Sequence, residues 1–308
     1  MHGGTLEFGS GARNRQGAVN LVGLCCALGL TLVGLAAPAA ADAPRPNRIL
    51  IEYVPPKNPA HQKIYETLKG HEVLEKLQQI FSPFKLPIDV TLKTVGCDGV
   101  DNAWYQRPTM TICYEYLDNI EKTAPKETTA AGITPQDAVI GQLFYVVGHE
   151  MGHAMFDLLN VPLFGRPEDA ADQFAAYLML KLGKDQARRL IGGAAYTYKD
   201  YVEVKKVAVP QTAFADVHGA PMQRLYNMLC MAYGADPKDF GDLVEKGYLP
   251  PQRARSCHNE FGEVNFAFQQ LIVPQLDRDL TKKVLDQEWL PPATSPPPLT
   301  DDSKPPQQ

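Results

Sequence analysis

The sequence lacks the features of several common protein classes. Basic residues do not outnumber acidic ones (Lys+Arg 30, Asp+Glu 35), the formal net charge is −5 and no basic stripe is present, so nothing indicates nucleic-acid binding. No internal repeat is visible. The 6 cysteines include no C-x-x-C spacing, which disfavours a metal site built from cysteine thiolates.

The first 41 residues are predicted to be a signal peptide rather than part of the fold. Arg13 and Arg15 form a basic start, residues 18–37 are apolar and rich in Leu, Gly and Ala, and Ala39–Ala41 offers a cleavage site. An uncleaved membrane anchor is the alternative, and the small residues argue against it. We therefore expect a periplasmic or secreted protein with no stable membrane anchor after cleavage near Ala41.

Four cysteines remain after this segment. In an oxidising compartment an even number indicates disulfides, and four cysteines allow three connectivities. We expect the nearest neighbours to pair, which gives Cys97–Cys113 and Cys230–Cys257.

The motif H-E-x-x-H at residues 149–153 is the most informative stretch of the chain. Residues four apart lie on one face of a helix, so His149 and His153 can both reach one metal ion. Glu150 is then placed to take a proton from a water molecule. Neutral imidazoles suit Zn²⁺, so the motif predicts a catalytic site with one zinc ion.

The motif lies within a predicted buried helix. Thr134 as N-cap, Pro135 at the first helical position and Asp137 in the first turn indicate its start, and residues 138–159 are apolar on nearly every side. Buried histidines and a buried glutamate need partners, because an unpaired polar group costs roughly 2–7 kcal/mol. Metal ligation supplies such partners; a pair of core histidines bonded to the backbone is the alternative.

A second helix is predicted from Arg166 to Leu178, and it carries a pair of carboxylates. Glu168 and Asp172 are four residues apart and share a face beside an apolar stripe. Such a pair is unusual unless it faces a cation. The alternative, that acids near a helix N-terminus merely favour its dipole, is stronger for Asp169 than for the other two.

This two-helix arrangement resembles that of the gluzincins, thermolysin-like peptidases whose second helix carries E-x-x-x-D. The resemblance implies that Glu168 is the third zinc ligand and that Asp172 hydrogen-bonds His149. The connector from His153 to Glu168 is shorter than in thermolysin, so Asp169 or Asp172 remains an alternative third ligand.

The segment Asn102-Ala103-Trp104 resembles the edge strand that borders the cleft of the same peptidases. The resemblance implies that Asn102 and Ala103 contact the main chain of the substrate. A turn with a packed tryptophan is the alternative.

His218 is the best remaining candidate for polarising a scissile carbonyl, as a downstream histidine does in thermolysin, and Asp216 would hold it. A loop histidine near a helix N-cap is the alternative. Arg224, in a helix predicted from residue 221 to 233, either holds substrate or pairs with an acid. The other histidines of the mature chain lie in polar contexts and are expected at the surface: His61, His71 and His258.

The order of predicted elements indicates an α+β fold. Strands are expected at residues 48–54, 88–95 and 108–117, with a helix over residues 60–81 interrupted near Gly70, before the motif helix and a mostly helical remainder. This looks like a zincin-like catalytic unit with a small mixed sheet. We expect an α+β subdomain at 42–165, a helical subdomain at 166–290 and a disordered, Pro-rich tail at 291–308.

Taken whole, the chain resembles a bacterial family of putative metallopeptidases. The resemblance rests on Asn102-Ala103-Trp104-Tyr105, Cys113-Tyr114-Glu115, His149–His153, Glu168–Asp172, Asp216-Val217-His218, Gln223-Arg224 and Cys230. It implies an exported zinc peptidase or related amide hydrolase that acts on peptide or protein substrates, with Glu150 as general base.

Two other functions compete with this one. A zinc-stabilised binding protein could keep the peptidase fold with little turnover, although the glutamate within the motif argues against it, since a structural site needs no base. An interaction module that binds no metal is the third possibility. Neither substrate preference nor oligomeric state is indicated by the sequence.

Overall fold

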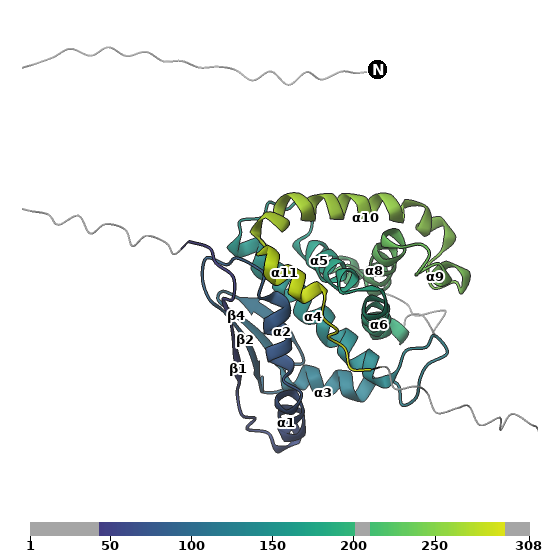
Figure 1. The fold of residues 1–308 in the computed structure, drawn as a ribbon. Coiled ribbons are helices and arrows are strands. Elements are labelled where there is room, and N and C mark those ends of the chain that lie inside the picture. The colour runs from purple at the N-terminus through teal and green to yellow at the C-terminus, as the bar shows by residue number, and fades with distance from the viewer. Residues whose placement is uncertain (1–42, 201–209, 293–308) are drawn as a thin grey trace, which may run out of the picture. The chain divides into compact units, whose positions relative to one another are not determined.

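The computed structural model describes residues 43–200 and 210–292 (Figure 1). The predicted signal peptide and residues 293–308 of the predicted tail lie outside the described residues. Within those two ranges no helix combines the length and the hydropathy that crossing a bilayer requires.

The described N-terminal residues form a mixed, four-stranded sheet in the order β1-β2-β4-β3. Its strands are β1 (Ile49–Tyr53), β2 (Val90–Val95), β3 (Ala103–Gln106) and β4 (Thr109–Cys113). β2 is parallel to both β1 and β4, whereas β3 runs antiparallel to β4 at the edge of the sheet. Val90, Leu92 and Thr94 of β2 are buried and alternate with partly exposed residues, as expected for a sheet with one face on the core.

Helices pack against this sheet and form the rest of the described chain, which confirms the predicted α+β fold. The α-helices are α1 (Gln62–Gly70), α2 (Val73–Phe81), α3 (Tyr114–Thr123), α4 (Pro135–Leu158), α5 (Pro167–Lys181), α6 (Lys184–Ala195), α8 (Pro221–Ala235), α9 (Asp242–Glu245), α10 (Pro251–Leu271) and α11 (Arg278–Leu285). Short 3₁₀ helices are η1 (Pro59–His61), η2 (Tyr196–Tyr198), η3 (Gln211–Phe214) and η4 (Val273–Gln275).

The motif helix α4 lies between the sheet and the C-terminal helices (Figure 1). It contacts β3 and β4 on one side and α5 and α6 on the other, which explains why its sequence is apolar all round. Its start agrees with the prediction, because the Thr134 side chain accepts a hydrogen bond from the Asp137 N–H at 3.0 Å and Pro135 is the first helical residue. Fully buried side chains such as Met151 and Met155 each contribute about 1.5–3 kcal/mol to folding.

Three predictions about local structure are wrong. The strand expected at residues 108–117 ends at Cys113 and continues as α3, because Tyr114, Leu117 and Ile120 are buried at helical spacing, a pattern hidden by the β-favouring residues before it. α8, which was predicted to end at residue 233, runs on to Ala235. His61 is buried rather than at the surface, since it packs against the ring of Tyr114.

Both predicted disulfides are confirmed. Cys97 pairs with Cys113 and joins the loop before β3 to the end of β4. Cys230 pairs with Cys257 and joins α8 to α10.

Two glycines allow α4 and α6 to cross closely. A Cβ atom added to Gly193 would lie 1.9 Å from the Asp137 carbonyl oxygen, and one added to Gly141 would lie 2.6 Å from the Ala194 nitrogen. Since both neighbours are backbone atoms, neither clash can be relieved by a side-chain rotation. The site described below depends on α4, so this crossing holds its main helix in place.

Gly193→Ala is therefore expected to destabilise the protein by about 3 kcal/mol, because the added methyl group forces the two helices apart. Thermal unfolding of the purified variant measures the effect. Gly262→Ala is the matched control: Gly262 lies within α10 with nothing near its Cβ position, and there alanine should stabilise the helix by about 0.5–1 kcal/mol. Equal melting temperatures for the two variants would contradict the close crossing.

Candidate metal centre

His149 and His153 of the H-E-x-x-H motif lie on the face of α4 that is turned toward α5. Nε2 of His149 and Nε2 of His153 are 3.1 Å apart, as the helical spacing predicts. His149 and Glu150 are buried, whereas His153 is partly exposed. The two imidazoles therefore direct ring nitrogens at one point that solvent can reach from the His153 side.

The start of α5 places Glu168 at that point. Oε2 of Glu168 lies 2.9 Å from Nε2 of His149 and 3.1 Å from Nε2 of His153. The helices can approach because small residues face each other: a Cβ on Gly152 would lie 3.2 Å from Cα of Ala171. The hydrogen bond from His149 lowers the pKa of Glu168 to about 2, so this carboxylate is ionised at neutral pH.

Asp172, one turn further along α5, holds the other side of the His149 ring. Its Oδ1 is 2.7 Å from Nδ1 of His149, and Arg224 of α8 donates to both Asp172 oxygens, each over 2.7 Å. Burial raises the pKa of Asp172, but hydrogen bonds from His149 and Arg224 outweigh burial and hold the pKa well below its usual range. Burial of His149 lowers the pKa of its imidazole, and the bonds to Asp172 and Glu168 reverse this and raise it to about 9. These carboxylates thus favour positive charge at the centre.

His218 reaches the same point from the loop before α8. Its Nε2 lies 3.0 Å from Oε2 of Glu168, so three imidazoles surround one carboxylate oxygen. Asp216 holds the loop histidine in this orientation: its Oδ1 accepts from the His218 N–H at 2.8 Å and lies 3.1 Å from Nδ1. The predicted pairing of Asp216 with His218 is therefore present in the structure.

Arg166 fastens this loop to the start of α5. Arg166 precedes Glu168 by two residues in the chain. Its guanidinium donates to the backbone carbonyl oxygens of Asp216 and Val217. The two residues of this contact are 50 positions apart in the sequence, and no local pattern predicts it. Arg166 thus helps to hold His218 beside the Glu168 carboxylate.

Arg166→Met is expected to increase amide hydrogen exchange at residues 216–219 by about tenfold or more, because charged hydrogen bonds each stabilise by about 1.5–3 kcal/mol. Exchange followed by mass spectrometry measures this directly. Arg255→Met, at an exposed arginine of α10, is the control and should leave this segment unchanged. Unaltered exchange in the Arg166 variant would mean that the loop is held by other contacts.

Glu150 faces the edge strand of the sheet. Its Oε2 accepts a hydrogen bond from the Tyr105 backbone N–H over 2.8 Å, and burial raises its pKa to about 7. Ala103 pairs with Ile112 of β4, which leaves the other side of β3 without a neighbouring strand in the part of the chain that the structure describes. Asn102 is exposed directly before this strand. The predicted Asn-Ala segment therefore lies on an edge strand that contacts the Glu150 carboxylate.

The donor set fits a zinc ion. Ligand atoms on one tetrahedral zinc ion lie about 3.3 Å apart, because Zn–N and Zn–O bonds are about 2.0–2.2 Å long. The nitrogen and oxygen atoms of His149, His153 and Glu168 are separated by 2.9–3.1 Å. Arg224 neutralises Asp172, whereas the Glu168 carboxylate faces three imidazoles, and a divalent cation bound there would supply its counter-charge.

A second group of possible ligands, Cys97, Cys113 and Glu115, is already engaged. Its cysteines form a disulfide, and the Glu115 carboxylate accepts the backbone N–H groups of Cys97 and Gly99. Among the described residues the centre around Glu168 therefore remains the better metal site.

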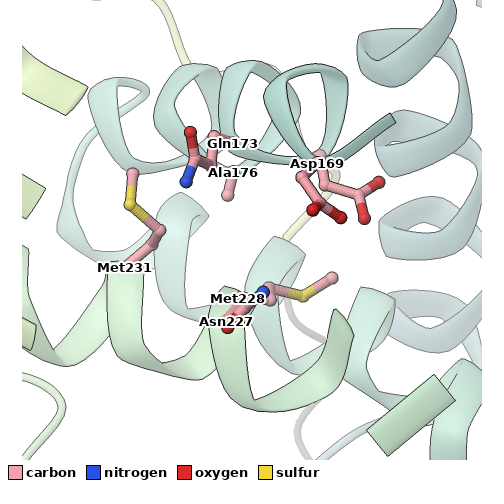
Figure 2. A pocket seen from close by; sticks show the side chains of 7 residues that line it. Asp169, Gln173, Ala176, Asn227, Met228 and Met231 are labelled. Carbon is pink, nitrogen blue, oxygen red and sulfur yellow. The ribbon is translucent and has the colours of Figure 1, made fainter. Parts of the chain in front are cut away.

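Asp169, which the sequence offers as an alternative third ligand, faces a different part of the structure. It lines a narrow pocket of about 10 Å³ between α5 and α8, with Gln173, Asn227 and Met228 (Figure 2). This volume admits about one water molecule. No described hydrogen bond or ion pair joins Asp169 to an imidazole of the centre, and the Asp172 oxygens are occupied by His149 and Arg224.

Arg224 was predicted to hold substrate or to pair with an acid. The structure has the second arrangement, since its guanidinium bonds Asp172 and approaches the Tyr145 hydroxyl at 3.4 Å. Substrate binding by this residue stays a prediction. Two contacts were not predicted. Tyr105 bonds Glu150 through its backbone N–H, which every residue except proline has, and Arg166 is an arginine at a helix start with no distinguishing local pattern.

A protein-family model described as "Putative metallopeptidase" (DUF4344) matches residues 53–272, which is more than half of the chain. No curated protein and no solved structure shows significant similarity to the chain.

Proposed function

This chain belongs to the DUF4344 family of putative metallopeptidases, and on that premise we propose that it is a zinc-dependent peptidase. The observation that carries the proposal is the convergence of His149 Nε2, His153 Nε2 and Glu168 Oε2 within 2.9–3.1 Å of one another. In this proposal those three atoms bind one zinc ion in the gluzincin manner. Asp172 fixes the ring of His149 through Nδ1, which also directs the lone pair of Nε2 toward the ion.

A bound zinc ion would supply Lewis-acid polarisation of a water molecule and of a peptide carbonyl. Glu150 is the general base: its carboxylate takes a proton from the attacking water and later returns one to the leaving amine nitrogen. The Tyr105 N–H, 2.8 Å from Oε2 of Glu150, holds one carboxylate oxygen and leaves Oε1 for this transfer.

His218 would stabilise negative charge on the carbonyl oxygen through its Nε2 hydrogen. Asp216 supports this role, because its contact with Nδ1 fixes the ring orientation. The substrate would lie along the free edge of β3 as an added strand, with its main chain bonded to Asn102 and Ala103. The free side of β3 and its contact with Glu150 support this placement.

Export to the periplasm or the cell exterior is part of the proposal. Two disulfides within the described residues support it, since such bonds persist in oxidising compartments.

The test begins with zinc content. The chain from residue 42 onward, purified and analysed by mass spectrometry of metals, is expected to hold about one zinc ion, which Glu168→Gln should remove. Asp169→Asn is the matched control, because Asp169 is the neighbouring acid that makes no contact with the imidazoles, and it should keep its zinc. Zinc retained by Glu168→Gln and lost from Asp169→Asn would overturn the ligand assignment.

Cleavage of an unstructured protein such as casein tests the reaction itself. Activity is expected in the zinc-loaded protein and should disappear on chelation and return with zinc. A protein that binds zinc and melts earlier on chelation, yet cuts nothing, would support the binding-protein alternative instead.

A further inference from the structure

A groove of about 430 Å³ lies beside the proposed catalytic site, along the first turns of α8. Phe214 of η3 forms one wall, and Ala220, Met222 and Tyr226 form another. Volumes of 300–1,000 Å³ are typical of pockets that bind small ligands. The groove is thus large enough for a bulky side chain. Its apolar walls are completed by three polar residues, Gln223, Asn227 and Arg253.

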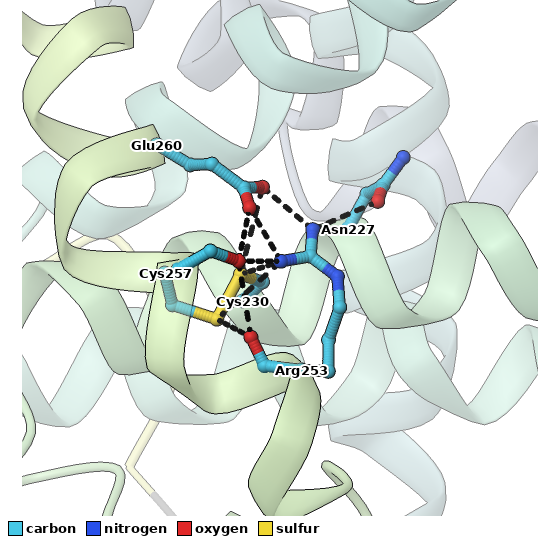
Figure 3. Close-up of a disulfide and its surroundings, with 6 residues drawn as sticks. Asn227, Cys230, Arg253, Cys257 and Glu260 are labelled. Atoms are coloured by element: carbon cyan, nitrogen blue, oxygen red, sulfur yellow. Dashed lines mark hydrogen bonds and ion pairs between the residues drawn. A yellow bond between two sulfur atoms is a disulfide. The ribbon is translucent and has the colours of Figure 1, made fainter.

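The described residues that line the groove carry no uncompensated charge. Arg253 of α10 is the charged residue in its lining, and both of its terminal nitrogens donate to Glu260 over 2.6 Å (Figure 3). Asn227 accepts a further hydrogen bond from this guanidinium at 3.1 Å. An acidic or basic ligand group would therefore find no free counter-charge there, whereas an uncharged apolar group would lose no strong interaction.

The α8 and α10 sides of the groove are held in fixed positions. The Cys230–Cys257 disulfide joins α8 to α10, and Arg253 bonds Asn227 across the same two helices (Figure 3). A Cβ added to Gly234 would lie 2.1 Å from the Cys257 carbonyl oxygen, so the helices cross in close contact. A binding site with such support is formed before its ligand arrives, which lowers the entropic cost of binding.

The groove begins next to the proposed oxyanion partner. Ala220 follows His218 by two residues, so their Cα atoms are at most about 7.6 Å apart. Gln223, also in the lining, is exposed in the first turn of α8 and offers an amide for a peptide main chain. A peptide whose carbonyl lies against His218 can thus place a neighbouring side chain in the groove.

Phe214 supports a ligand of this kind. Its side chain is 65 % exposed, and an aromatic ring left in water beside an apolar groove marks a surface that gains free energy when covered. Phe266 on α10 is equally exposed at 66 % but does not line the groove, so it provides a comparison within the same protein.

We propose that this groove binds an uncharged apolar side chain, aliphatic or aromatic, of the peptide substrate close to the scissile bond. The inference rests on the proposed peptidase function and adds its substrate class: polypeptide segments with a large apolar residue at one fixed position. The groove then sets the cleavage preference, and the free edge of β3 binds the main chain without regard to sequence.

The test compares cleavage profiles. An unstructured protein is digested with the zinc-loaded wild type, Met222→Arg, Phe214→Ala and the control Phe266→Ala, and the cleavage sites are identified by mass spectrometry. The wild type and the control should require Leu, Phe or a similar residue at one position near the cut. Met222→Arg should lower kcat/KM for apolar peptides about tenfold or more and favour Asp or Glu there, and Phe214→Ala should weaken the preference.

Binding provides an arm that needs no turnover. Each groove substitution is combined with Glu150→Gln, and fluorescence anisotropy measures the Kd for a labelled peptide with Phe and for its Ser counterpart. Met222→Arg should weaken binding of the Phe peptide about tenfold and leave the Ser peptide unchanged. Melting temperatures confirm that the variants are folded.

The outcomes separate the two claims. Absence of any zinc-dependent cleavage, with the Phe peptide still bound in the groove, would reject the peptidase function and keep the groove as a binding site. Cleavage without apolar preference, or a profile unchanged by Met222→Arg, would overturn the inference and leave the peptidase function standing.

Discussion

Replacement of Glu150 by glutamine is expected to lower kcat for peptide hydrolysis about 10³-fold, within the range that general-base catalysis contributes. Glutamine has nearly the shape of glutamate and can still accept the hydrogen bond from the Tyr105 N–H. It has no basic oxygen, so it cannot take the proton of the attacking water. Zinc content should stay near one ion per chain, because Glu150 is not among the three proposed ligands.

The comparison is with Glu52→Gln, at an exposed glutamate of β1, which should retain full activity. Initial rates on a quenched peptide, together with zinc analysis of both variants, give the result. A Glu150→Gln protein that cleaves at the wild-type rate would remove the general base from the mechanism. A variant that loses zinc as well as activity would indicate that Glu150 helps to assemble the metal centre rather than to catalyse the reaction.

The parts of the site that lie close together in sequence were predictable. His149 and His153 share a face because of helical spacing, and the N-cap Thr134 and the proline at the first position of α5, Pro167, mark where the two helices begin. Glu168 and Asp172 followed from the second helix and the gluzincin resemblance. Their proximity to His149 is present in the structure at 2.9 and 2.7 Å.

The long-range contacts were not predictable from one sequence. Arg224 meets Asp172 across 52 residues and Tyr105 meets Glu150 across 45, and periodicity reports only which face of an element is buried. The strand that was predicted to run to residue 117 ends at Cys113 for a similar reason: β-favouring residues continue into a helix whose apolar spacing becomes decisive only when it packs. Contacts between segments that lie far apart in the sequence, rather than local propensity, complete the centre.

Arg224→Met is expected to destabilise the protein by about 3–5 kcal/mol, because it leaves the buried Asp172 carboxylate without its main counter-charge. The side chains of Arg224 and Asp172 are only 21 % and 11 % exposed, and their bidentate geometry is the strongest kind of ion pair. The substitution removes both hydrogen bonds from Arg224 to Asp172 and leaves the one from the His149 ring. For a domain of this size the melting temperature should fall by about 10 °C.

Arg107→Met is the matched control, since Arg107 forms an ion pair with Asp157 that is 55 % and 39 % exposed, and exposed pairs contribute about 0–1 kcal/mol. Melting is measured with chelator present, so that zinc binding does not add to the difference. Asp172→Asn in the Arg224→Met background should recover part of the loss, because the uncompensated charge is gone, and the double-mutant cycle then gives the coupling between the two side chains. If both arginine variants lose equal stability, the buried pair does not stabilise the centre, and Arg224 returns to its other predicted role in holding substrate.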